Sequence, residues 1–208
     1  MKIICIGQNY PSHNKEMNRA AGSTDDDPVL FMKPDTAILH NDEKRFYIPD
    51  FSNDIHYEAE IVVKINKMGK NIAERFAHRY YEDITIGIDF TARDLQSALK
   101  EKGQPWEIAK AFDNSAGIGK FIPKSSVGKE MNNISFELLK NNKIVQSSNT
   151  SEMIHPLDKI IAYASRFFTL KTGDLIFTGT PAGVGRVEIG DELSGWVEGQ
   201  KLLEIQIC

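Results

Sequence analysis

Residues 55–63 form an apolar run rich in β-branched side chains, yet two glutamates, Glu58 and Glu60, interrupt it. The run follows a polar segment at 50–54 and ends before Asn66 and Gly69, which predicts a strand over 55–63. Because side chains alternate across a strand, both glutamates lie on one face, roughly 6–7 Å apart along it. Buried like charges repel and lose solvation, and a hard divalent cation offsets that cost. The alternative is a half-exposed strand whose solvent face carries two glutamates.

The composition favours one soluble, mildly acidic domain, or a domain with a small appendage. The chain has 208 residues, of which 26% are charged, and a net charge of -4, enough length for a core without disulfides. No basic block is present, so we expect no nucleic-acid partner. The opening apolar run, 3–6, is too short for a signal peptide or a membrane helix, and Cys5 and Cys208 suggest no disulfide framework. We therefore expect a cytoplasmic protein with no membrane association.

Strand patterns outnumber helix patterns, which predicts an α+β fold dominated by β. Strands or hairpins are expected over 1–6, 28–34, 37–39, 46–48, 84–90, 121–122, 134–145, 175–177 and 191–207. Helices are expected from Pro11, over 71–80 with Asn71 as the cap, after Thr91, and from Pro156 to 168. A turn is expected at Gly117 and Gly119.

A candidate acid–base pair lies near the start of the chain. On a short helix opened by Pro11, His13 and Glu16 are i and i+3 neighbours on one face. A carboxylate beside an imidazole raises its basicity and orients it, as a general base requires; the alternative is a solvated helix face with an incidental pair. The following residues, to 27, are small, polar and acidic, so we expect 10–27 to act as a mobile lid.

Other candidate polar groups lie where strands end. The alternation in 84–90 places isoleucines on one face and Thr85, Gly87 and Asp89 on the other, which indicates close approach of another group to Asp89. Lys33 and Lys110 are either surface residues or cations for an anionic ligand. The glycine- and threonine-rich loop 178–185 offers backbone N–H groups to anions, but it lacks the ending of a P-loop.

Six segments, in order, resemble motifs of the fumarylacetoacetate hydrolase family. They are GQNY…H…E in 7–16, PVLFMKP in 28–34, EAE in 58–60, DFTARDLQ in 89–96, KAFD in 110–113 and GD…TGTPAGVG in 173–185. They cover nearly the whole chain, and the short length with the Asp-x-Thr-Ala-Arg-Asp form is most similar to the acylpyruvate hydrolase and oxaloacetate decarboxylase branch.

The resemblance implies a single catalytic domain over 1–208, with a mixed β-sandwich roll and a few short helices, assembled as a homodimer. It implies Glu58, Glu60 and Asp89 as metal ligands, and three oxygen donors suit Mg²⁺ or Mn²⁺. His13 and Glu16 match the family's water-activating pair, and Lys110 would neutralise a developing oxyanion. The residues expected to hold substrate oxygens or to support the metal ligands are Lys33, Arg93, Gln96 and Thr180. An alternative for Arg93 is a structural pair with Asp94.

The activity implied by the resemblance is cleavage of a C–C bond in acylpyruvates or other 2,4-diketo acids, through a metal-chelated enolate. Alternatives are decarboxylation of oxaloacetate, or tautomerisation or isomerisation of a 2-keto acid or diacid, for example 2-hydroxyhepta-2,4-diene-1,7-dioate. A further alternative is a binding module in which the ion is structural. The chain departs from the family at Gln8, where arginine is usual, and at Gly117, where proline is common and whose loop we expect to be looser.

Overall fold

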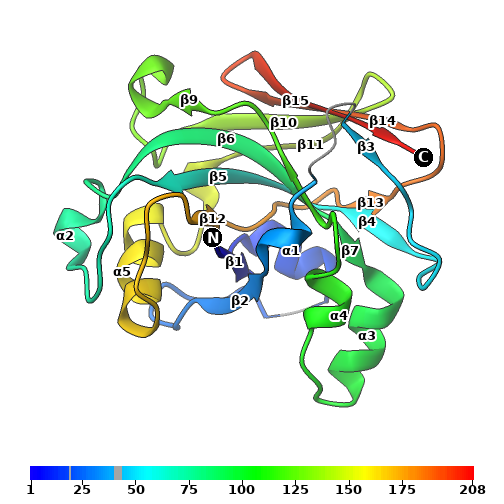
Figure 1. Ribbon diagram of the computed structural model, residues 1–208, viewed down its shortest axis with the longest axis horizontal. Coiled ribbons are helices and arrows are strands. Elements are labelled where there is room, and N and C mark those ends of the chain that lie inside the picture. The colour runs from blue at the N-terminus through cyan, green and yellow to red at the C-terminus, as the bar shows by residue number, and fades with distance from the viewer. Residues whose placement is uncertain (19, 40–43) are drawn as a thin grey trace.

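Two β-sheets face each other in the computed structural model, which describes residues 1–18, 20–39 and 44–208 (Figure 1). A seven-stranded mixed sheet has the order β2-β1-β12-β5-β6-β8, with β9 also paired to β6. Its strands are β1 (Ile3–Gly7), β2 (Val29–Lys33), β5 (Ala59–Ile65), β6 (Tyr81–Asp89), β8 (Ala116–Ile118), β9 (Ile122–Pro123) and β12 (Leu175–Phe177).

The second sheet has five strands in the order β11-β10-β14-β15-β3. They are β3 (Arg45–Phe46), β10 (Ser135–Lys140), β11 (Lys143–Asn149), β14 (Glu192–Val197) and β15 (Gln200–Ile207). A small third sheet joins β13 (Gly185–Arg186), β4 (Ile55–Tyr57) and β7 (Thr91–Ala92). The expected β-dominated α+β sandwich is confirmed.

The helices are short. They are α1 (Pro11–Glu16), α2 (Glu74–Ala77), α3 (Arg93–Glu101), α4 (Glu107–Lys110) and α5 (Leu157–Phe167), with 3₁₀ turns η1 (Asp35–Ala37), η2 (Lys124–Val127) and η3 (Thr150–Glu152). In Figure 1, α2 and α5 lie together at one end, and α3 and α4 at the other. Within the described ranges, no helix is long and apolar enough to cross a membrane.

The alternation expected in 84–90 explains how β6 lies between two cores. Ile84, Ile86 and Ile88 are fully buried in the main core. A Cβ on Gly195 of β14 would lie 2.8 Å from Cγ2 of Ile86, so the two sheets approach closely there. The opposite face of β6 is buried as well, because a smaller apolar cluster that includes Phe177 covers it. That second face ends in Asp89, which is 0% exposed.

The strand expected over 55–63 is broken at Glu58. β4 pairs with β7 and β13, whereas β5 pairs with β6 and β12, so the chain changes sheets at this residue. The expectation of one continuous strand is therefore wrong, because two strands, β4 and β5, occupy this segment. The break nevertheless leaves the backbone of Glu58 bonded to the end of β6, because its carbonyl accepts a 2.9 Å hydrogen bond from the N–H of Asp89.

Three other local expectations are wrong. The helix expected over 71–80 is only the single turn α2, because Asn71 has a φ of 50° and Phe76 on the expected apolar stripe is 39% exposed. The strand expected at 37–39 is reduced to an isolated bridge between Ile38 and Ala116, because Ala37 belongs to the turn η1. Gly117 lies in strand β8, paired with Ile88, instead of in a loose turn. In each case, contacts distant in sequence override the local pattern.

Candidate active site

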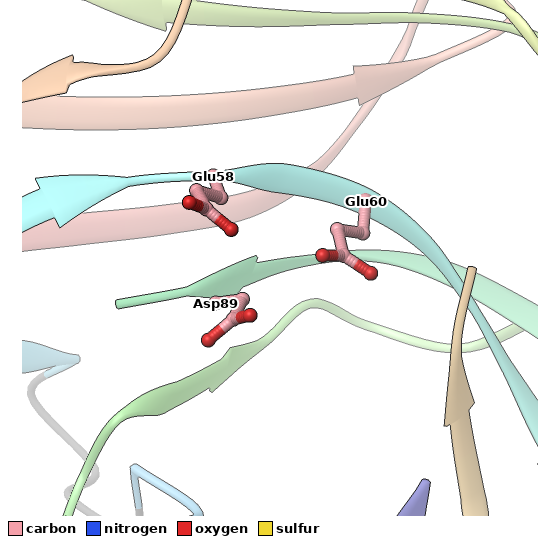
Figure 2. Close-up of side chains that lie close together, drawn as sticks. All are labelled: Glu58, Glu60 and Asp89. Carbon is pink, nitrogen blue, oxygen red and sulfur yellow. The ribbon is translucent and has the colours of Figure 1, made fainter. Parts of the chain in front are cut away.

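Three carboxylates meet in the interior, at the end of the β5–β6 ladder. One oxygen from each of Glu58, Glu60 and Asp89 lies within 4.8 Å of the others, and all three side chains are buried. Figure 2 shows the carboxylates turned toward a common space, with Asp89 contributed by the neighbouring strand. The register explains the arrangement, since Glu60 lies directly opposite Gly87, two residues before Asp89. The expected grouping of the three residues is thus present in the fold.

Lys110 is bonded to two of the three carboxylates. Its Nζ donates to Oε2 of Glu58 at 2.7 Å, to Oδ2 of Asp89 at 2.6 Å and to the Thr91 hydroxyl at 2.7 Å. Lys110 ends the single-turn helix α4, and the backbone of the next residue leaves the helix there. This buried cation neutralises the carboxylate cluster, and its expected contact with a substrate oxyanion stays a prediction.

Two further cations complete the neutralisation. Nζ of Lys33 lies 2.8 Å from Oδ1 of Asp89 and also donates to the Ser115 hydroxyl at 2.9 Å. Arg93, the first residue of α3, pairs with Oε1 of Glu58 and donates to Oε1 of Gln96 at 2.7 Å. Three buried carboxylates are therefore faced by three buried cations, which avoids the cost of an isolated buried charge.

The two glutamates titrate in opposite directions. Burial by itself would raise the pKa of Glu58, but Lys110 and Arg93 beside it hold that pKa well below its usual range. Burial and the nearby charges of Asp89 and Glu58 raise the pKa of Glu60 well above its usual range. Of the two glutamates, Glu60 thus retains a proton more readily, and a bound cation would have to displace that proton.

The donor set fits a hard divalent cation. All three candidate ligands are carboxylates, which suits Mg²⁺ or Mn²⁺ better than a softer metal. Among the described residues, no hydrogen-bond donor is aligned with Oδ1 of Asp89, although Lys33 forms an ion pair with it. The enclosed space beside the carboxylates is small, with room for about one ion or water molecule.

His13 and Glu16 lie in the same cavity region, on α1. His13 is buried, lines the cavity with the three carboxylates, and places Nδ1 3.4 Å from Oε2 of Glu16. Oε1 of Glu16 accepts a 3.1 Å hydrogen bond from the N–H of Gly183, and the N–H of Gly179 donates to Oε2 of Glu60 at 2.7 Å. The glycine-rich loop expected to bind an anion therefore binds two of the protein's own carboxylates.

Comparison with known proteins identifies the family. The protein-family model described as "Fumarylacetoacetate (FAA) hydrolase C-terminal" matches residues 2–207 of this chain. This chain belongs to the fumarylacetoacetate hydrolase family.

Members of the family similar to this chain have several named activities. An oxaloacetate tautomerase of Escherichia coli K12, YcgM, is 39% identical over 201 residues, covering 97% of this chain and 90% of that protein. A mitochondrial oxaloacetate decarboxylase of Dictyostelium discoideum is 37% identical over 198 residues, which cover 95% of this chain and 89% of that protein. The crystal structure of fumarylpyruvate hydrolase from Pseudomonas aeruginosa, in complex with Mn²⁺ and pyruvate, superposes with a TM-score of 0.91 at 36% identity, covering 100% and 89%.

Of the four residues that the family resemblance implied for substrate binding, three line the carboxylate cavity and one does not. Arg93, Gln96 and Thr180 line the carboxylate cavity, whereas the Lys33 ammonium is enclosed behind Asp89. Arg93 pairs with Glu58 instead of with Asp94, whose carboxylate accepts from the Ser52 hydroxyl at 2.6 Å. Thus Arg93 supports a candidate metal ligand directly.

Sequence reasoning missed several residues that hold the site together. The Gln146 side chain accepts from the N–H of Ala59 at 2.9 Å and donates to Oγ1 of Thr180 at 2.9 Å. Thr91 and Ser115 bond the two lysines. A glutamine in the middle of hairpin strand β11 carries no local signal for such a role, because its partners come from distant parts of the chain.

The two departures from the family have clear structural settings. Gln8 lines the cavity and has a φ of 61°, with its carbonyl accepting from Nδ2 of Asn14 at 3.0 Å. The loop expected to be looser at Gly117 is strand β8, and a Cβ there would lie 2.5 Å from Cδ1 of Ile205. Close packing between the sheets, and not a loose loop, accounts for glycine at this position.

Proposed function

We propose that this protein is a Mg²⁺- or Mn²⁺-dependent enzyme that enolises 2-keto acids, and that tautomerisation of oxaloacetate is its main reaction. The observation that carries the proposal is the buried cluster of Glu58, Glu60 and Asp89 with its facing cations. A divalent ion held by these carboxylates would polarise the keto oxygen of a chelating 2-keto acid and acidify the neighbouring carbon. With all three carboxylates ionised, the charges of the carboxylates and the facing cations balance, so the bound ion would leave the cluster with a net positive charge, which suits an anionic substrate.

Residues around the cluster supply the remaining requirements of the reaction. His13 takes the proton from the carbon next to the keto group, with Glu16 orienting the imidazole and Gly183 fixing Glu16. Transfer of that proton from the His13 imidazolium to the former keto oxygen completes the tautomerisation without a co-reactant. The Lys110 ammonium, which bonds Glu58 and Asp89, is placed to balance negative charge that develops on that oxygen.

Hydrolysis of acylpyruvates is a second candidate, favoured by the same His13–Glu16 pair. In that reaction the imidazole takes a proton from water, and the hydroxide attacks the distal carbonyl. The similarity to the fumarylpyruvate hydrolase structure supports this candidate, whereas the tautomerase relative supports the first. Decarboxylation of oxaloacetate needs the same chelating site but no attacking water, and a relative with that name keeps it as a third candidate.

A substrate panel separates the candidates. Purified protein with Mg²⁺ or Mn²⁺ is given oxaloacetate, acetylpyruvate and fumarylpyruvate, and keto–enol exchange, C–C cleavage and CO₂ release are followed separately. The proposal expects the fastest turnover for oxaloacetate tautomerisation and its loss in Asp89→Asn. Binding of Mg²⁺ with no effect of any 2-keto acid on the bound metal would instead support a module with a structural ion.

Assembly, location and lid motion are further parts of the proposal. A homodimer of single catalytic domains is expected from the family, and light scattering on the full chain tests it. A cytoplasmic location is also part of the proposal. The proposed lid, 10–27, includes α1 and also Arg19, which lies outside the described residues. The hydrogen bond from Gly183 to Glu16 is one contact that opening would break.

A further inference from the structure

One end of the molecule carries a concentration of positive charge that is not visible as a block in the sequence. Segments 66–79 and 163–173 contain six lysines and arginines but only one acidic residue, Glu74, although the whole chain has a net charge of -4. The fold brings these segments together, because Gly69 and Leu170 form a β-bridge and α2 packs against α5 (Figure 1). All six cations are exposed, and together they form what we call the basic end: Lys67, Lys70, Arg75, Arg79, Arg166 and Lys171.

Two arginines of the basic end share one aromatic ring. The guanidinium carbons of Arg75 and Arg79 lie 4.8 and 5.0 Å from the centroid of the Phe76 ring. The two charged groups are therefore at most about 10 Å apart, a distance over which salt at physiological concentration does not fully screen their repulsion. An anion bound beside them would relieve that repulsion.

Nearby carboxylates do not neutralise these arginines. Glu82, which follows α2 in sequence, pairs with Lys124 at 3.6 Å. Asp27 lies at the border of the basic end, where it forms a hydrogen bond with Tyr163. Within the described ranges, none of the three arginines of the basic end forms an ion pair with a carboxylate. The positive charge of this end is therefore available to a partner.

The same end exposes large apolar side chains. Met68, Phe76 and Phe167 are 67%, 39% and 54% exposed. The guanidinium carbon of Arg166 lies 5.7 Å from the centroid of the Phe167 ring, so cations and apolar groups lie next to each other here, as they do at Phe76. A partner that buries the apolar groups while it neutralises the cations gains from both contacts.

An anionic lipid surface offers both contacts. Phosphate headgroups would meet the cations, and the apolar side chains would enter the boundary with the acyl chains. A small anion or a highly acidic peptide would leave the apolar side chains in water. Single-stranded nucleic acid binds by stacking its bases on aromatic rings, and at Phe76 two guanidinium groups already lie close to the ring. Figure 1 shows α2 at the outer end of the molecule, where an extended surface can reach it.

We propose that the basic end docks this protein on an anionic phospholipid surface as a peripheral contact. Its cations bind headgroup phosphates, and Met68, Phe76 and Phe167 enter the interface. The sequence-based expectation of no membrane association considered apolar segments, and a peripheral contact of this kind needs none. The proposal is independent of the proposed chemistry, because the carboxylate cluster lies in other segments of the chain.

The test is sedimentation of the full chain with vesicles of phosphatidylcholine, with or without 30 mol% phosphatidylglycerol, in low and high salt. Arg75→Gln/Arg79→Gln removes two charges from the basic end. Lys143→Gln/Arg186→Gln removes two charges from exposed positions in β11 and β13 and is the matched control. Circular dichroism and Tm check that each variant is folded.

The wild type should bind the anionic vesicles and not the neutral ones, and binding should weaken in high salt. The binding constant should fall about fivefold for each cation removed near an anionic surface, hence about 25-fold for Arg75→Gln/Arg79→Gln. The control variant should change less than threefold. No binding of the wild type to anionic vesicles in low salt, or equal losses for the two double variants, would overturn the proposal.

A second set of variants tests the apolar contact. Met68→Ser and Phe167→Ser should each weaken vesicle binding about fivefold, whereas Ile189→Ser, at a 78% exposed position elsewhere, should not. The loop residue Met68 keeps this test decisive if Phe167→Ser disturbs α5. Unchanged binding in Met68→Ser would show charge attraction alone and exclude docking at a lipid interface. Polyglutamate and oligouridylate serve as competitors, and tighter binding of either than of the anionic vesicles would replace the lipid by an acidic protein or a nucleic acid.

Discussion

The N–H of Gly179 donates a 2.7 Å hydrogen bond to Oε2 of Glu60, across 119 residues of chain. Gly183, four residues later, makes the equivalent 3.1 Å bond to Glu16. Both glycines have positive φ, 99° and 97°. One loop therefore fixes both a candidate metal ligand and the carboxylate that orients His13, so a change in the loop should affect metal binding and acid–base chemistry together.

Replacement of Gly179 by alanine should destabilise the protein by about 1–3 kcal/mol, as expected for strained backbone. An added Cβ would lie 2.8 Å from Cβ of Asn9, in addition to the cost of the positive φ. Gly173→Ala is the matched control, because its φ is 90° but no atom lies within 4 Å of the added Cβ. Urea unfolding of both variants measures the difference, and Mg²⁺ titration should show weaker binding only for Gly179→Ala. Equal unfolding free energies for the two variants would show that the contact between the added Cβ and Asn9 does not contribute to the destabilisation.

Glu60→Gln and Glu58→Gln should have opposite effects on stability in buffer without divalent metal. The pKa of Glu60 is raised above the unfolded value of about 4.3. Between these two pKa values the folded state binds more protons, so the free energy of unfolding falls as pH rises. Glu60→Gln should remove this fall and raise Tm at neutral pH, while abolishing Mg²⁺ binding.

Glu58 gives the opposite sign. Its pKa is lowered, so its stabilisation is present above the unfolded pKa and is lost as pH falls through the folded value. Glu58→Gln leaves Arg93 without the carboxylate of Glu58 and Lys110 with one carboxylate, Asp89, in place of two, and should cost about 3 kcal/mol at neutral pH. Tm measured from pH 4 to pH 8 compares the variants; a lower neutral-pH Tm for Glu60→Gln than for the wild type would contradict the assignment.

Mg²⁺ should stabilise the folded protein through the buried cluster. At 100 times its Kd, the ion adds about 2.7 kcal/mol to the free energy of unfolding. Asp89→Asn should lose this stabilisation, whereas Asp25→Asn, in the exposed acidic run at 25–27, should keep it. Thermal unfolding with increasing Mg²⁺ provides the measurement. Retained stabilisation in Asp89→Asn would place the bound ion elsewhere.

His13→Ala should lower both tautomerisation and acylpyruvate cleavage by about 10²- to 10⁴-fold, the usual contribution of a general base. Mg²⁺ binding should be unchanged, because the three candidate ligands are carboxylates. His78→Ala, an exposed histidine, provides the control. Steady-state rates and Mg²⁺ titrations on the same samples separate the two roles. Survival of acylpyruvate cleavage in His13→Ala would show that this imidazole does not activate water.

Asn9→Ala should destabilise the protein by about 2–4 kcal/mol. The buried Asn9 side chain accepts from the N–H of His155 at 2.8 Å and donates to the carbonyls of His155 and Thr178 at 3.1 and 2.8 Å. Asn149→Ala also removes three hydrogen bonds, but at a more solvent-accessible position, and should cost about 1 kcal/mol or less. Chemical unfolding compares the pair, and similar costs would show that burial is not what makes Asn9 important.

The sequence by itself determined the elements that depend on local pattern. The alternation in 84–90 predicted β6 and the inward direction of Asp89, and Pro11 predicted α1 with His13 and Glu16 on it. The ordered motifs predicted the family, and with it the grouping of three carboxylates. Each of these signals depends on neighbours within a few residues, or on an order of motifs that is visible without coordinates.

Only the tertiary structure decided which partners the candidate site residues have. Lys110 joins Glu58 and Asp89 across 52 and 21 residues, and the glycine loop reaches Glu60 across 119. The switch between sheets at Glu58 and the enclosure of Lys33 behind Asp89 also carry no local signal. The physical reason is that buried charges must be paired, and which opposite charge is within reach depends on how distant segments pack together.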